Sequence, residues 1–152
     1  MKLSDYLRKE QCLLNLRATT KQDAIVEIVK HLAGLGKVSD PAAFIEAIMA
    51  RERLGSTGIG HQVAIPHSPT QGTADFVIGF GRSSEGIEFG SIDGDKVRLI
   101  FLLGTNPNNL NMYLKLLAKL AKLLNDESFR KELIAAPTEG AVLEAVQRWE
   151  ND

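Results

Sequence analysis

Hydrophobic residues in the first third of the chain recur at intervals of three and four, which predicts two helices. The first begins after Thr20 and ends near Gly34, and the second begins after Asp40 and ends at Gly55. Thr20 and Asp40 are typical N-cap residues, because their side-chain oxygens accept a hydrogen bond from the first helical turn. The buried stripes of the two helices comprise Ala24, Ile25, Ile28, Val29 and Leu32, and Phe44, Ile45, Ile48 and Met49.

The middle of the chain changes to short apolar runs that are typical of strands. Strands are predicted over residues 12–16, 62–66, 74–82 and 96–104, bounded by glycines and turn residues. The run 96–104 is almost entirely apolar, which favours a central strand covered on both faces. From residue 108 the helical period returns, and Asp126 and Thr138 are expected to cap two further short helices. This order predicts an α/β domain with helices on both faces of a sheet.

Composition and charge exclude several classes of partner. Eighteen basic and nineteen acidic residues give a formal net charge of -1, so no overall positive field attracts a nucleic acid or an anionic membrane. No run approaches the ~18 apolar residues of a membrane-spanning helix, and the first residues lack the apolar core of a signal peptide. With Cys12 as its single cysteine, the chain has no disulfide framework. We expect a cytoplasmic protein without stable membrane insertion.

The segment "GSTGIGHQVAIPH", residues 55–67, is the main candidate for chemistry. Gly55 and Gly60 have the glycine spacing of a nucleotide-binding phosphate loop. That motif then requires a lysine and a serine or threonine, and His61 and Gln62 stand in those places. The loop also follows a helix and enters a strand, the reverse of the usual order. The pattern therefore argues against nucleotide binding.

A metal site would have to use His61 and His67. If the intervening residues are extended, about 20 Å separates the two side chains at ~3.3 Å per residue. The sequence offers no third ligand at a useful spacing. Neither a metal nor another cofactor is expected.

A third hypothesis is that His67 is a nucleophile. An imidazole accepts a phosphoryl group on one nitrogen when the other keeps its proton and is held by an acceptor such as a backbone carbonyl. Pro66 fixes the backbone before His67, and the glycine loop offers N–H groups that, with Arg51 or Arg53, would balance phosphoryl charge. The alternative from the residues alone is an ordinary hydrogen-bonded histidine at a strand end.

The run "RERLGSTGIGHQVAIPH" resembles the active-site signature of the IIA components of the bacterial phosphoenolpyruvate-dependent phosphotransferase system, of the mannitol, fructose and nitrogen-regulatory type. The resemblance extends from "LSDYL" near the start to "LKLLAKLAKLLND" near the end. It implies one IIA domain over residues 1–152, a single-domain sandwich with a mixed, mainly parallel sheet of about five strands. In the absence of a fused membrane or IIB segment, the sequence is most similar to the stand-alone nitrogen-regulatory branch.

The resemblance also implies roles for individual residues. His67 matches the histidine that takes a phosphoryl group on Nε2 from the phosphohistidine of the carrier HPr. The group then passes to a IIB domain, or its presence switches binding to a regulatory target protein. Arg51, sixteen positions before His67, matches an arginine that would clamp phosphate; the alternative is a solvated charge at a helix end. The implied phosphate-binding loop comprises Gly55, Ser56, Thr57, Gly58 and Gly60, with Ser68 as an auxiliary residue.

Two departures from the family pattern concern Tyr113 and His61. The family commonly has a second histidine where Tyr113 stands, at the start of the late helix. A phenol donates a hydrogen bond but stays neutral near pH 7. The alternative function is therefore a regulatory protein-binding module with little or no phosphotransfer. His61 is either an auxiliary residue replacing the missing histidine or an exposed loop residue.

Overall fold

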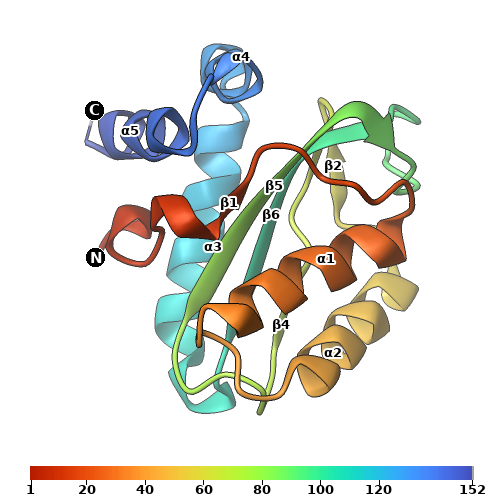
Figure 1. Ribbon diagram of the computed structural model, residues 1–152, viewed down its shortest axis with the longest axis vertical. Helices are drawn as coiled ribbons and strands as arrows, with labels where there is room; N and C mark the ends of the chain where they lie inside the picture. The colour runs from red at the N-terminus through yellow and green to blue at the C-terminus, as the bar shows by residue number, and fades with distance from the viewer. Residues whose placement is uncertain (152) are drawn as a thin grey trace.

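The computed structural model describes residues 1–151 and consists of a mixed sheet covered by helices on both faces (Figure 1). The helices are α1 (Lys21–Gly34), α2 (Pro41–Leu54), α3 (Leu110–Leu124), α4 (Glu127–Ala135) and α5 (Glu139–Glu150), with short 3₁₀ helices η1 (Leu3–Asp5), η2 (Lys9–Gln11) and η3 (Pro107–Asn109). The strands are β1 (Cys12–Leu13), β2 (Gly58–Gly60), β3 (Val63–Ala64), β4 (His67–Pro69), β5 (Val77–Ile87) and β6 (Val97–Thr105). The predicted α/β architecture is confirmed.

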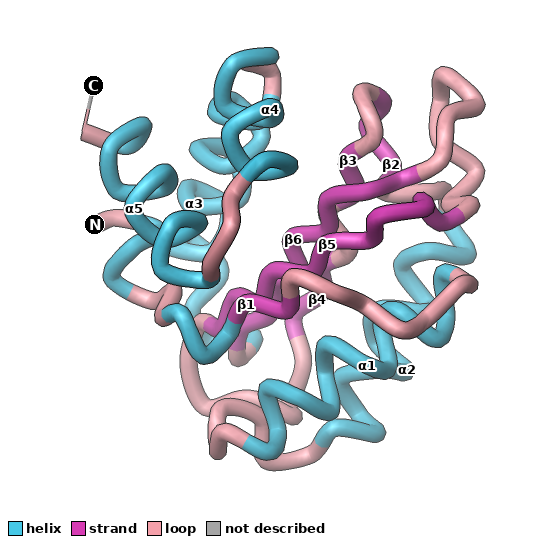
Figure 2. The backbone as a smooth tube through the Cα atoms, turned by 45° about the horizontal axis from the view of Figure 1, so that its top comes forward, coloured by secondary structure: helices cyan, strands magenta, loops and turns pink. Residues whose placement is uncertain are grey.

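The sheet is built around β6. Its strand order is β1-β5-β6-β3-β2, and β4 also pairs with β6, beyond the end of β3. Within residues 1–151, three of the five strand pairings are parallel, whereas the longest, between β5 and β6, is antiparallel. Figure 2 shows the strands between the two groups of helices. The central position predicted for residues 96–104 is confirmed by the burial of β6.

Alternate residues of β6 contribute to two hydrophobic cores on opposite faces of the sheet. Leu99, Phe101 and Leu103 pack with residues of α3, α4 and α5, whereas Ile100 and Leu102 pack with residues of α1 and α2. This alternation is the two-residue period of a strand. A strand with an apolar residue at every position is thus stable only where helices cover both faces.

Glycines in β5 allow α1 to lie close to the sheet. A Cβ atom at Gly79 would lie 2.9 Å from Cγ2 of Ile28, and one at Gly81 would lie 2.8 Å from its Cδ1. Both distances are shorter than carbon atoms tolerate. The glycines therefore allow α1 to pack closely against β5.

The strand predicted over residues 62–66 is shorter in the structure, and the short strands β2 and β4 lie on either side of it along the chain, so that residues 1–151 contain six strands instead of about five. Only Val63 and Ala64 pair as β3, and pairing with β6 resumes at His67. Ile65 N–H donates to the Thr57 carbonyl (3.1 Å) instead, and Pro66 has no N–H to donate. Ile65 and Pro66 therefore separate β3 from β4.

Arg82 of β5 holds the C-terminal end of α4 against the sheet. Its Nη1 donates to the carbonyl oxygens of Leu133 (3.0 Å), Ile134 (3.0 Å) and Ala136 (2.8 Å). These are carbonyls left without partners at a helix end, where a cation also complements the helix dipole. A single guanidinium thus closes the junction between α4 and α5.

Replacing Arg82 with methionine is expected to lower the free energy of unfolding by about 2–3 kcal/mol, because these carbonyls lose a charged donor. Urea denaturation followed by circular dichroism measures the change. Arg53→Met is the control, since Arg53 pairs on the surface with the exposed Glu46 and should cost less than about 0.5 kcal/mol. Equal stability of the two variants would contradict the assignment.

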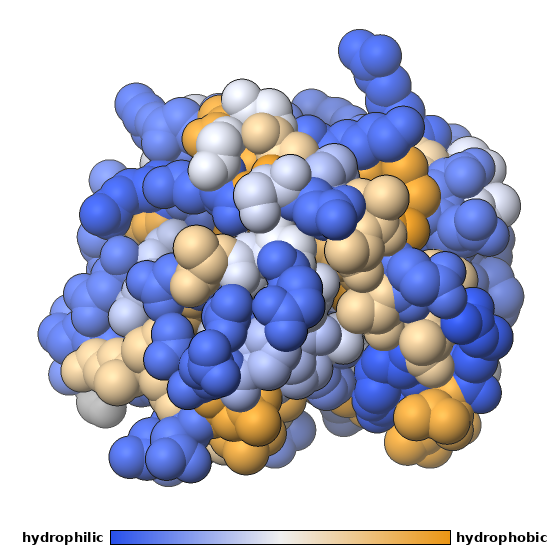
Figure 3. Space-filling model, turned by 90° about the horizontal axis from the view of Figure 1, so that it is seen from below, coloured by the Kyte–Doolittle hydropathy of each residue, from blue (hydrophilic) through white to orange (hydrophobic). Residues whose placement is uncertain are grey.

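The surface shows no large apolar face in the view from below. Hydrophilic side chains cover most of that face, and apolar side chains lie in separate patches (Figure 3). Among residues 1–151, no helix has both the length and the apolar character to cross a membrane.

Candidate functional site

His67 is the first residue of β4 and lies opposite Leu103 of β6. Its half-buried imidazole places Nδ1 2.6 Å from the carbonyl oxygen of Ile65. Because a carbonyl oxygen only accepts hydrogen bonds, Nδ1 carries the ring proton. Nε2 of the neutral ring therefore keeps its lone pair, which is the state required of a nucleophile.

The local sequence explains this geometry. Ile65 uses its N–H toward Thr57, and the Pro66 carbonyl accepts the Leu103 N–H (3.0 Å). The Ile65 carbonyl therefore turns toward the side chain two residues later instead of continuing the ladder with β6. Pro66 thus separates a sheet-bonded segment from a histidine held by its own backbone.

Burial lowers the pKa of His67 below its ordinary value of 6.5. The Ile65 carbonyl raises it, the Arg51 charge lowers it further, and the Glu52 charge raises it. Desolvation is the largest of these effects, since burial disfavours the charged imidazolium. The ring is accordingly neutral at pH 7.

Arg51 lies in the last turn of α2, and its Nη1 donates to the Gly55 carbonyl (2.8 Å). Its charge lowers the pKa of both His67 and Tyr113. The structure therefore brings together the arginine, the histidine and the tyrosine selected from the sequence. Arg53, the other arginine considered, pairs on the surface with Glu46 (3.1 Å).

Tyr113 lies in the first turn of α3, with its ring centroid 6.2 Å from that of His67 and the planes inclined by 50°. The side chain is buried, and within residues 1–151 its hydroxyl has no hydrogen-bond partner. Burial raises the pKa of Tyr113, opposed by the Arg51 charge. The phenol is thus a neutral, unused donor beside the imidazole.

Tyr113→Phe is expected to stabilise the protein by about 1 kcal/mol, because it removes a buried hydroxyl that lacks a partner. If the hydroxyl donates to a group bound at His67, the same change slows phosphorylation of His67 about tenfold. Thermal unfolding and the rate of phosphoryl labelling measure the two effects. A more stable variant with an unchanged rate would show that the hydroxyl has no part in the chemistry.

The predicted phosphate-binding loop uses most of its N–H groups internally. Gly55 N–H donates to the Glu52 carbonyl (3.1 Å), Thr57 N–H to Glu52 Oε1 (3.3 Å), and Gly58 N–H to Ser56 Oγ (3.0 Å). The expectation of free N–H groups at these three positions is therefore wrong. The physical reason is that Glu52 and Ser56 supply acceptors within reach of the loop.

The loop glycines are explained by packing and backbone conformation. A Cβ at Gly58 would lie 2.2 Å from Ser91 Oγ and 3.0 Å from its Cβ, so a side chain at this position would require Ser91 to shift. Gly60 has a φ of 91°, a value that L side chains rarely adopt. These glycines fit the segment against the turn that precedes β6.

The two auxiliary candidates, His61 and Ser68, have other surroundings. His61 lies apart from the imidazole of His67, and the Ser68 hydroxyl contacts a backbone carbonyl. His61 is exposed in the turn between β2 and β3, with a φ of 56°, and its N–H donates to Asp93 Oδ2 (3.0 Å). Val63, two residues after His61, lies opposite Leu99 of β6. Leu103, the residue opposite His67, is about 13 Å further along that strand. Ser68 Oγ donates to the Pro69 carbonyl (2.8 Å).

The sequence analysis missed Glu52. Its side chain is only 2% exposed, beside Arg51 and close enough to affect the His67 pKa. The signal was available, because Phe44, Ile48 and Glu52 recur every four residues and form the buried face of α2. A carboxylate on that face is uncommon unless it is paired.

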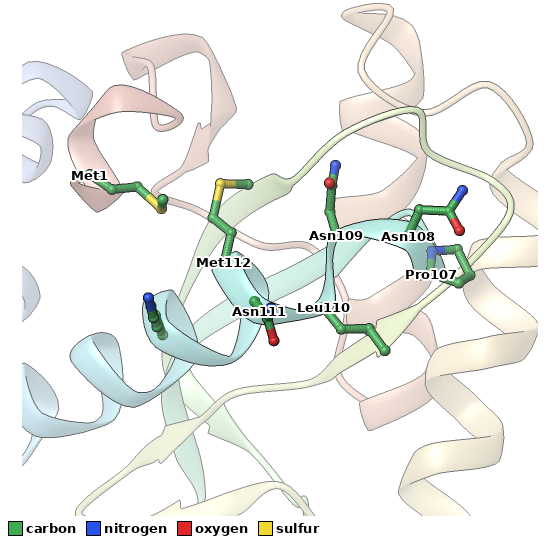
Figure 4. A pocket seen from close by; sticks show the side chains of 8 residues that line it. Met1, Pro107, Asn108, Asn109, Leu110, Asn111 and Met112 are labelled. Carbon is green, nitrogen blue, oxygen red and sulfur yellow. The ribbon is translucent and has the colours of Figure 1, made fainter.

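A cavity of about 520 Å³ lies beside η3 and the first turn of α3, with Met1 at one side (Figure 4). Its other lining residues are Pro107, Asn108, Asn109, Leu110, Asn111, Met112 and Lys115, so Tyr113 is absent from its wall. Within residues 1–151 there is no group of three His, Cys, Asp or Glu side chains that could hold a metal ion. The histidine, arginine and tyrosine therefore remain the candidate site.

These features define an α/β protein with a histidine-centred site. The model of the family "Phosphoenolpyruvate-dependent sugar phosphotransferase system, EIIA 2" matches residues 5–149. The chain belongs to this family.

Curated relatives include sugar-specific and nitrogen-regulatory proteins. The chain is 36% identical to the fructose-specific EIIABC component of Bacillus subtilis, over 97% of this chain and 23% of that protein. It is 35% identical to a nitrogen regulatory protein of Bradyrhizobium diazoefficiens, over 90% of this chain and 88% of that one. The chain thus spans less than a quarter of the first relative and most of the second.

Solved structures similar to this chain also include nitrogen-regulatory and sugar-specific IIA proteins. The nitrogen regulatory protein IIA-Ntr from Neisseria meningitidis is similar with a TM-score of 0.87 and 30% identity, covering 95% of this chain and 98% of that one. IIA mannitol from Escherichia coli is similar with a TM-score of 0.77 and 27% identity, covering 92% and 98%. The resemblance stated from the sequence is therefore confirmed.

Proposed function

We propose that this protein is a phosphocarrier that accepts a phosphoryl group on Nε2 of His67 from the phosphohistidine of an HPr-type donor protein. The observation that carries the proposal is the 2.6 Å contact between Nδ1 and the Ile65 carbonyl. It leaves the lone pair of a neutral ring on Nε2, beside the charge of Arg51. Family membership supports the same chemistry.

In the proposed transfer, the Nε2 lone pair of His67 attacks phosphorus in line with the bond to the donor nitrogen. The new N–P bond forms as the donor N–P bond breaks, and the donor nitrogen keeps the released electron pair. The Nδ1 proton stays in place, and its bond to the Ile65 carbonyl stabilises positive charge that develops on the ring. Arg51 balances the negative charge of the phosphoryl oxygens, and we propose that no cofactor takes part because the phosphoryl donor is another protein.

The next recipient is proposed to be a IIB domain or a regulatory target protein. One similar structure, 26% identical with a TM-score of 0.76, is the complex of IIA mannitol with phosphorylated IIB mannitol from Escherichia coli. Nitrogen regulatory proteins among the relatives support the regulatory recipient. We take residues 1–152 as one EIIA 2 domain that acts in the cytoplasm. The family match does not favour the alternative of a binding module without phosphotransfer.

Incubation with phosphoenolpyruvate, enzyme I and HPr tests the proposal. We expect one phosphate per chain, labile in acid and stable in base, and peptide mapping should locate it at His67. Omission of HPr should abolish the label. No label in the complete mixture, or a label at another residue, would overturn the proposed function.

A further inference from the structure

Glu52 is a buried carboxylate that joins three elements near His67. Its Oε1 lies 3.1 Å from Nζ of Lys21, at the start of α1, and accepts the Thr57 N–H at 3.3 Å. Its Oε2 is buried and has no hydrogen-bond partner among the residues that the structure describes. Lys21 also lies over the ring of Phe89, with Nζ 5.3 Å from the centroid. The carboxylate is thus fixed from α1 and from the loop.

Three hydrogen bonds, joined through the backbones of Thr57 and Ile65, lead from this carboxylate to the imidazole. Glu52 Oε1 holds the Thr57 N–H, the Thr57 carbonyl accepts the Ile65 N–H at 3.1 Å, and the Ile65 carbonyl accepts the Nδ1 proton of His67 at 2.6 Å. Two residues, Thr57 and Ile65, therefore separate the carboxylate from the ring. A shift of the Thr57 backbone would be passed through the Ile65 backbone to the carbonyl that selects the ring tautomer.

The free-energy cost of burying this carboxylate indicates that it does more than link a helix to a loop. A buried ion pair of this kind contributes little net stability compared with apolar side chains of similar size, because both charges lose hydration. An unpartnered carboxylate oxygen adds a further cost. The arrangement is explained if the exact position of the Thr57 peptide matters to the histidine.

We propose that Glu52 is a positioning residue for His67: by holding the Thr57 N–H it fixes the Ile65 carbonyl, and so keeps the proton on Nδ1 and the lone pair on Nε2. Its effect on the ring is independent of phosphotransfer. Only its effect on the transfer rate rests on the function proposed above.

Two conservative variants separate the effect of the Glu52 side-chain length from the effect of its negative charge. Glu52→Asp keeps the charge near Lys21, but its shorter side chain no longer reaches the Thr57 N–H. Glu52→Gln loses the charge but keeps an oxygen at the same reach. Glu46→Asp and Glu46→Gln are matched controls on the exposed face of the same helix, where Glu46 is 74% exposed.

The first readout is the ¹⁵N NMR spectrum of the His67 ring in unphosphorylated protein, which reports the proportion of each tautomer. We expect Glu52→Asp to lose part of the Nδ1–H form and Glu52→Gln to retain it. The second readout is the initial rate of labelling by phosphorylated HPr. It should fall about tenfold in Glu52→Asp and stay within about threefold of the wild type in Glu52→Gln.

Thermal unfolding of each variant reports its folding, and the NMR readout compares only folded protein. A wild-type tautomer ratio in Glu52→Asp, or the reverse order of the two variants, would overturn the proposal. If the wild-type protein takes no phosphate at all, the proposed function fails. The tautomer ratio still decides the role of Glu52 in that case.

Discussion

Replacing His67 with glutamine is expected to abolish acid-labile phosphorylation of the protein, a loss of more than about 1000-fold in rate. In the proposed reaction the new bond forms at Nε2, and an amide nitrogen has no available lone pair for this attack. The glutamine side chain is similar in length and polar, so the half-buried position at the start of β4 stays filled. The loss should therefore be chemical and not structural.

Folding supplies the control for this variant. His67 contributes one hydrogen bond from its ring, to the Ile65 carbonyl, so the free energy of unfolding should change by only about 1 kcal/mol. Urea denaturation measures that change beside the labelling assay. Equal label on a stable His67→Gln protein would mean that another residue is the acceptor. A variant that fails to fold would show that the imidazole has a larger structural role than its contacts indicate.

The helices were predictable because their ends carry local signals. Thr20, Asp40 and Thr138 accept a hydrogen bond from the N–H three residues later, and Asp126 accepts one from Ser128 N–H. Each cap bond joins residues only two or three positions apart, so the caps depend little on tertiary context. Helix boundaries from 20 to 54 and from 127 to 150 follow from such signals and from the apolar period.

The interruption between β3 and β4, just before His67, was not predictable in the same way. The mostly apolar run 62–66 predicts one strand, but the Ile65 N–H bonds to Thr57 instead of to β6. That choice depends on where the loop returns, which is a tertiary contact without a local pattern. The same contact turns the Ile65 carbonyl toward the imidazole.

The candidate site was predictable only in part, because some of its contacts are tertiary and leave no local pattern in the sequence. The resemblance to the family signature selected His67 and Arg51, and the structure brings them together with Tyr113. The state of the loop N–H groups depends on Glu52, whose burial results from the position of α2 on the sheet. The four-residue spacing of Phe44, Ile48 and Glu52 was available in the sequence, but a glutamate on that face is usually expected to be exposed.

The second large effect is expected from Arg51→Met, which should slow phosphorylation of His67 by about 100- to 1000-fold, the usual loss when one charged donor to a developing anion is removed. The phosphorylation rate of Arg51→Lys should lie between those of Arg51→Met and the wild type. An ammonium group keeps the charge but lacks the planar guanidinium that forms two parallel hydrogen bonds to phosphoryl oxygens. Labelling rates measure both variants, with Arg53→Met as the control on the same helical turn.

A second measurement tests whether Arg51 acts on His67 directly. Its positive charge lowers the pKa of His67, so Arg51→Met should raise that pKa, and Arg51→Lys should raise it less. NMR titration of the imidazole gives the values without any phosphoryl donor. The structural cost is the bond from Arg51 to the Gly55 carbonyl, about 1 kcal/mol. A normal labelling rate in Arg51→Met with a raised pKa would mean that Arg51 sets the ring's charge state but does not hold the phosphoryl group.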